Sequence, residues 1–107
     1  MTNQVSVALC AGRHQIKTNE GVEVIDSIFN HIENPMDFDY MEGRASDFLH
    51  EIENNGVQIL NLYITGLTPA LTSFLALAKH APTLKITLWH FNRLTGDYMP
   101  QYFQNWM

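Results

Sequence analysis

The chain has little of several features on which protein functions commonly depend. Cys10 is its single cysteine among 107 residues, so no internal disulfide can form, and metal sites usually draw on more than one cysteine. A lone free cysteine fits a reducing compartment, and residues 1–4 carry no basic leader of a secretory signal. We therefore expect a cytoplasmic protein with no metal and no cofactor.

Positive charge is also scarce. Six Lys and Arg stand against eleven Asp and Glu, which gives a formal net charge of −5 at pH 7. Because binding to duplex nucleic acid depends on many cation–phosphate contacts, we expect no such binding by this chain alone. No run of about 18 apolar residues exists, so we expect no membrane-spanning helix. A local anion site stays open, because it needs only backbone N–H groups and one or two arginines.

The length and the apolar content fit one domain. Hydrophobic residues make up 46% of the chain and include six Phe, four Tyr and two Trp, which is enough for one core. A chain this short buries only about 60–70% of its unfolded surface. We predict a single α/β domain over residues 1–107, for which pairing as a homodimer would add stability.

Strand patterns recur along the chain. Three segments alternate apolar and polar residues or are nearly continuous in β-prone residues, as strands are: 4–10, 57–64 and 84–91. The near-continuous segment 57–64 is typical of a strand that is covered on both faces. After a turn at 94–97, residues 98–103 can return as a short strand, and Pro100 places that strand at an edge.

Two segments have the pattern of helices. Residues 34–37 combine a capping Asn with a Pro suited to a first turn, and Gly56 stops the helix that follows. Apolar residues recur between them at helical spacing: Phe38, Met41, Ala45, Phe48, Leu49 and Ile52. Thr68 and Pro69 start a second helix, which ends before Pro82.

The order of these elements predicts the topology. Strand, helix, strand, helix, strand and hairpin favour parallel pairing with right-handed crossovers. We predict a small Rossmann-like parallel sheet of about three strands, with an edge hairpin strand and two main helices. Residues 15–36 give a mixed pattern: Val22 and Val24 alternate as in a short strand, whereas Ile25, Ile28, Phe29 and Ile32 are spaced like a helix face. We expect irregular structure there, with a short element at 22–33.

Polar residues follow the predicted strands at one edge of the sheet, where open parallel sheets usually bind ligands. The candidates come from the ends of all three strands: Gly12, Arg13 and His14, then Thr65, Gly66 and Thr68, then His90, Asn92 and Arg93. Two of the three arginines of the chain are among them. This convergence predicts a binding site for a small anionic ligand.

The turn at residues 65–69 has a physical rationale as part of that site. Gly66 lets a ligand approach the backbone closely, and the N–H groups at the helix start favour an anion. The hydroxyls of Thr65 and Thr68 can add hydrogen bonds, whereas Pro69 removes one donor. The alternative is that the turn only connects a strand to a helix, because it has neither the Walker nor the dinucleotide glycine spacing.

The other candidates also have two interpretations. Arg13 and His14 can hold a phosphate or a carboxylate, and His14 can act as a general acid or base near neutral pH, or both can form a solvated loop. His90 can equally be a partly buried, hydrogen-bonded side chain. Asn92 and Arg93 can simply shape the hairpin. His31, His50 and His80 lie on or near the predicted helices and show no metal-ligand spacing with a second His or Cys.

Several segments carry a resemblance to known families. A family of small uncharacterised bacterial and phage proteins is similar at residues 11–14, 34–37, 60–71, 88–93 and 95–98. More distantly, the Thr-Gly turn between a strand and a helix resembles Rossmann-like sensor domains and ring nucleases of CRISPR defence. That resemblance implies a dimer that binds cyclic oligoadenylates, with Thr65, Gly66 and Thr68 at the ligand.

The sequence leaves three functions open. The first is a binding module for a small anionic, nucleotide-like ligand in phage or bacterial defence, with phosphodiester chemistry as an open extension. The second is an anti-CRISPR-like acidic protein that inhibits a nucleic-acid-processing enzyme without catalysis. Its basic partner would meet an acidic helix stripe: Asp37, Asp47, Glu51 and Glu53. The third is an accessory domain without activity of its own.

Overall fold

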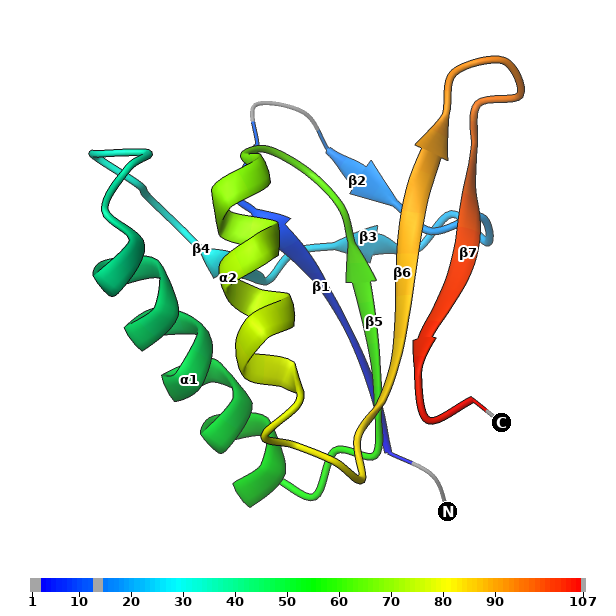
Figure 1. Ribbon diagram of the computed structural model, residues 1–107. Coiled ribbons are helices and arrows are strands. Elements are labelled where there is room, and N and C mark those ends of the chain that lie inside the picture. Colours follow the sequence, from blue (N-terminus) through cyan, green and yellow to red (C-terminus); the bar gives the residue numbers. More distant parts are fainter. Residues whose placement is uncertain (1–2, 13–14, 107) are drawn as a thin grey trace.

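Two helices pack on one face of a five-stranded sheet in the computed structural model, which describes residues 3–12 and 15–106 (Figure 1). The elements follow one another as β1 (Gln4–Cys10), β2 (Ile16–Lys17), β3 (Glu23–Val24), β4 (Ser27–Phe29), α1 (Phe38–Asn54), β5 (Ile59–Tyr63), α2 (Thr68–Ala78), β6 (Lys85–Asn92) and β7 (Asp97–Gln104). The strand order is β4-β1-β5-β6-β7, and β2 pairs with β3 in a separate antiparallel hairpin. Strands β4, β1, β5 and β6 run parallel, and β7 is antiparallel to β6.

The α/β class, the two main helices and the edge hairpin strand are confirmed, but the predicted strand count is wrong. About three parallel strands were expected, and the sheet has four. The additional strand is β4, which lies within residues 22–33, where the sequence pattern is mixed and predicts only a short element. Three residues are too few to show alternation, and this strand exists because it pairs with Ala8 and Cys10 of β1.

Helix α1 begins a few residues later than its capping signal suggests. Its N-cap is Asp37, whose carboxylate accepts a hydrogen bond from the backbone N–H of Tyr40 at 3.1 Å. Asn34 instead accepts from the N–H of Met36 at 2.9 Å, so it shapes the turn before the helix. The apolar stripe of α1 is buried as expected, except for Phe38, which stays 51% exposed at the first turn.

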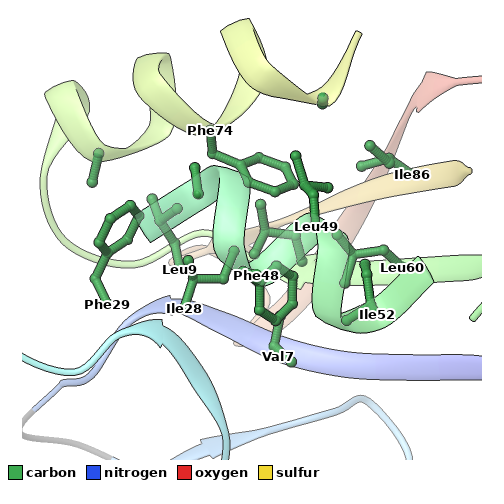
Figure 2. Packing of buried hydrophobic residues seen from close by; sticks show 14 of the residues in the cluster. Val7, Leu9, Ile28, Phe29, Phe48, Leu49, Ile52, Leu60, Phe74 and Ile86 are labelled. Atoms are coloured by element: carbon green, nitrogen blue, oxygen red, sulfur yellow. The ribbon is translucent and has the colours of Figure 1, made fainter. Parts of the chain in front are cut away.

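The main core fills the space between the two helices and the sheet. Large apolar side chains from both layers interdigitate there, as Figure 2 shows: Val7, Leu9, Ile28, Phe29, Phe48, Leu49, Ile52, Leu60, Phe74 and Ile86. Full burial of such a side chain contributes about 1.5–3 kcal/mol. This layer therefore supplies most of the stability on which a site at the sheet edge can rest.

The opposite face of the sheet is covered only in part. The β2–β3 hairpin packs over Ala8 and Tyr63, near the carboxyl ends of the parallel strands. Toward the amino ends, Ile59 and Asn61 of β5 are half-buried. The expectation that residues 57–64 are covered on both faces is therefore wrong for this half, where Asn61 instead accepts a hydrogen bond from the Trp89 indole at 3.0 Å.

The outer edge of β7 is blocked to further strand pairing at Tyr98 and Pro100. The carbonyl of Trp89 in β6 accepts a hydrogen bond from the N–H of Ile64, so the backbone groups of Trp89 face β5. Pro100, which pairs with Trp89 in β7, therefore directs its backbone away from β6. The N–H that proline lacks would not have bonded within the sheet. The next outward residue is Tyr98, and the Asn19 side chain bonds both of its backbone groups, at 3.0 and 2.9 Å. Asn19 thus protects the sheet edge from pairing with another chain.

Substituting Asn19 by alanine should open this edge. We expect a loss of about 1 kcal/mol in the free energy of unfolding and faster hydrogen exchange at the Tyr98 amide, measured by NMR. Met99 pairs with His90 of β6 and should keep its protection. The control is Gln15→Ala, which removes an exposed bond to Glu23 on the same hairpin. Unchanged exchange at Tyr98 in the Asn19 variant would contradict this role.

Candidate functional site

The carboxyl ends of the four parallel strands meet at one edge of the sheet, and both helices begin there (Figure 1). Strand β1 leads into residues 11–12, β4 into residues 30–37, and β5 into residues 64–67. Of the predicted site residues, Arg13 and His14 lie outside the described part of the chain. The remaining candidates fall into three groups at this edge.

The hydroxyl of Thr65 joins the ends of β5 and β1. It donates to the carbonyl oxygen of Cys10 at 2.7 Å and accepts from the Cys10 N–H at 3.1 Å. The side chain thereby takes the place that a neighbouring strand would take in the ladder. Its donor is already used within the protein, so the structure gives Thr65 a part in shaping the edge.

Gly66 makes the closest approach of backbone to side chain in this turn. Its φ is +82°, in the left-handed region, and a Cβ built on it would lie 2.7 Å from the Cys10 Cβ and 2.8 Å from its Sγ. Only a residue without a side chain fits there without displacing Cys10. The glycine therefore serves the contact between the turn and β1.

Cys10 is the residue that both Thr65 and Gly66 contact in this turn, and the sequence pattern did not predict this role. Burial raises the pKa of the Cys10 thiol, and a hydrogen bond from the Leu67 backbone lowers it by a smaller amount. The thiol therefore stays protonated at neutral pH and acts as a packing group. The β1–β5 register, which pairs Ala8 with Tyr63, places Cys10 opposite Thr65 and would have revealed the contact.

The start of α2 carries an uncompensated helix dipole. Its N-cap, Leu67, provides no side-chain hydrogen bond, and the first turn has no acidic residue, whereas α1 begins with Asp37 and Asp39. Pro69 removes one of the free donors, but the partial positive charge persists. Thr68 is exposed at this point, so the first turn of α2 is the part of the described edge best suited to an anion.

Three hollows border this edge of the sheet. One, of about 410 Å³, lies between the first turns of the helices and is lined by Phe38, Glu42, Thr68, Pro69, Thr72, Ser73 and Ala76. Another, of about 320 Å³, adjoins Gly12 between β1 and the β2–β3 hairpin, and no residue lines both. The third, of about 360 Å³, is lined by Glu33 and Asp37 among others, so it holds two carboxylates that disfavour an anion, against the single carboxylate of Glu42 in the first hollow.

The candidates on β6 lie further along the hairpin. His90 is half-buried, and its Nε2 lies 2.8 Å from Oε1 of Gln101 on β7. The Asn92 side chain accepts from the Leu94 N–H at 2.9 Å, which shapes the turn, and Arg93 is exposed there. The last β5–β6 pair is Tyr63 with Trp89, so Asn92 lies about 10 Å beyond the end of β5.

The structure thus brings Thr65 and Gly66 together on Cys10 and places Thr68 beside them at the helix start. It places Gly12 at a separate hollow, and Asn92 and Arg93 at the projecting hairpin tip. Within residues 3–12 and 15–106, no three His, Cys, Asp or Glu side chains are arranged to hold a metal ion. In the same part of the chain, no helix is long and apolar enough to cross a membrane.

Comparison with known proteins reveals a structural likeness. Neither a family model nor a curated protein matches the chain. The fold is similar to that of an Acinetobacter baumannii Cap4 SAVED/CARF-domain containing receptor, solved with the cyclic trinucleotide 2'3'3'-cAAA, at a TM-score of 0.55 and 17% identity over 95% of this chain. The same receptor with 3'3'3'-cAAA gives a TM-score of 0.55 over 94% of this chain. The chain spans about a quarter of the receptor's length, 25% and 24% in the two complexes. At this identity the likeness shows a shared fold.

Proposed function

We propose that the protein is a binding module for a small anionic, nucleotide-like ligand at the carboxyl edge of its sheet. The observation that carries this proposal is the fold shared over 95% of the chain with a receptor solved with a cyclic trinucleotide. The uncompensated start of α2 supports it, because this helix end lies at the edge where open parallel sheets bind ligands.

Each part of the edge has a distinct role in the proposed site. The first turn of α2, with the hydroxyl of Thr68, would bind a phosphate group. Phe38 lines the hollow beside Thr68 and is 51% exposed, so its ring offers a surface on which a base can stack. Thr65 and Gly66 would position the loop through Cys10, and no contact of theirs with the ligand is required.

The remaining predicted residues enter the proposal from the sequence. Arg13 and His14 directly follow Gly12 in the sequence, and they remain predicted contacts of a ligand that extends to its hollow. His90, Asn92 and Arg93 would contact only a ligand that reaches the hairpin tip. The proposal includes no reaction, because it assigns a chemical step to none of these side chains.

A cyclic trinucleotide of adenosine should raise the thermal stability of the protein. At a ligand concentration of 100 times Kd the expected gain is about 2.7 kcal/mol, or roughly 10 °C in Tm for a domain of this size. Thr68→Glu should raise Kd at least tenfold, because a carboxylate at the helix start repels a phosphate while favouring the helix itself.

The matched control for this experiment is His80→Glu, at an exposed position just past the other end of α2 and outside this hollow, where the added carboxylate should leave the affinity nearly unchanged. Thermal scans cover mononucleotides, linear oligoadenylates and cyclic oligonucleotides. The proposed function is wrong if none of these compounds raises Tm, or if both glutamate variants bind the ligand as tightly as the parent protein does.

A further inference from the structure

The outer edge of β1 is paired along only part of its length. The carbonyl of Asn3 accepts from Ile59 of β5, and the N–H of Ala8 donates to Asp26 at the start of β4. Backbone N–H and C=O groups alternate in direction along a strand. The backbone groups of Gln4 and Ser6 therefore point away from β5, toward the side on which Ala8 bonds β4. Among residues 3–12 and 15–106, β4 is the strand on that side, and it pairs with Ala8 and Cys10. The edge at Gln4 and Ser6 is left open.

A groove runs along this open edge. It has a volume of about 440 Å³ and lies between β1 and α1. Half-buried Val5 and Val57 line its floor over the buried Phe48 and Ile52, and polar side chains make up about half of the lining. Ile25, which is 83% exposed, stands at its rim next to β4. An added strand would complete the ladder with its backbone and could lay apolar side chains against Val5 and Ile25.

The charges around the groove favour a basic occupant. Its lining includes the carboxylates of Asp26 and Glu51 and one cation, Arg44. The Nε of Arg44 donates to the carbonyl of Ile28 at 2.8 Å, which holds this side chain beside β4. The acidic side chains thus face solvent at a groove in a protein of net charge −5, and complementary charge directs association.

A second copy of the chain matches this groove poorly. Residues 3–8, the segment that two copies would pair, contain no Lys or Arg. Self-pairing would also bring Glu51 of one copy toward the acidic rim of the other. The second edge of the sheet differs again, because Asn19 and Pro100 close β7. The open edge therefore suits a different protein.

We propose that the edge of β1 at Gln4 and Ser6 binds a basic extended segment of a partner protein, which adds to the sheet as a strand below β4. The added strand would pair its backbone with Ser6, lay apolar side chains against Val5 and Ile25, and place a Lys or Arg next to Glu51. This mode of recognition relies mainly on backbone hydrogen bonds, with pockets for alternate side chains. It is independent of the proposed ligand site at the carboxyl edge.

A model peptide tests this proposal, because backbone pairing makes the detailed sequence secondary. The probe is a nine-residue peptide in which valine alternates with lysine and threonine, titrated into the ¹⁵N-labelled full chain. We expect saturable binding, with the largest NMR shift changes at Gln4, Ser6 and the groove face of α1, and slower exchange of the Ser6 amide. An N-methylated peptide and a peptide with glutamate in place of lysine should each bind at least tenfold more weakly.

Two charge reversals on one helix complete the test. Glu51→Lys should weaken peptide binding at least tenfold, whereas Glu53→Lys, which is exposed on α1 but does not line the groove, should not. Both positions are exposed, so both variants should fold. Absence of binding, equal binding of the N-methylated peptide, or equal effects of the two reversals would overturn the proposal. Self-association of the chain through Ser6 would overturn it in favour of a second copy.

Discussion

Gly66→Ala is expected to lower the free energy of unfolding by about 2–6 kcal/mol. The φ of +82° at Gly66 strains any residue with a side chain, at about 1–3 kcal/mol. The new methyl would lie 2.7 Å from the Cβ and 2.8 Å from the Sγ of Cys10, and such overpacking costs a further 1–3 kcal/mol or so. Urea unfolding followed by tryptophan fluorescence measures the loss.

Gly96→Ala separates the two causes. Gly96 has a φ of +78°, and a Cβ there meets no atom within 4 Å, so the same strain arises without a collision. We expect this control to lose only the strain term of about 1–3 kcal/mol, without the cost of the collision. If the two alanine variants are equally destabilised, the close contact with Cys10 is not what makes Gly66 necessary.

The sequence was informative where periodicity extends over many residues. The alternation of β1 and β6 and the apolar stripe of α1 predicted the elements that build the core. Strand β4 has only three residues, and its existence depends on pairing with Ala8 and Cys10, far along the chain. A one-dimensional pattern does not contain that information, so the sheet was predicted too small.

In the candidate site, too, local features were predictable from the sequence and long-range contacts were not. The turn at residues 65–67 was correctly placed between a strand and a helix, because Gly punctuates an apolar run there. Its contact with Cys10 depends on the register between β1 and β5, which periodicity leaves undefined. Likewise, Asn92 and Arg93 lie far from the turn because β6 continues beyond the end of β5. That extension is stabilised by pairing with β7.

Thr65→Val is expected to cost about 2–4 kcal/mol. Valine keeps the branched shape of the side chain but removes the hydroxyl that both donates to and accepts from the Cys10 backbone. These groups are partly buried, and each one left without a partner costs about 1–3 kcal/mol. Urea unfolding measures the loss, and faster hydrogen exchange at the Cys10 amide identifies its origin.

Thr65→Ser and Thr72→Val are the matched controls for this effect. Serine retains the hydroxyl, so most of the stability should return, and the Thr72 hydroxyl only bonds the exposed carbonyl of Thr68 one turn back in α2. We expect losses below about 1 kcal/mol in both controls. If Thr65 positions the loop at the start of α2, the valine variant should also weaken cyclic-trinucleotide binding, and the serine variant should restore it. Normal ligand affinity in a destabilised Thr65→Val protein would show that the joint between β1 and β5 stabilises the fold without shaping the proposed site.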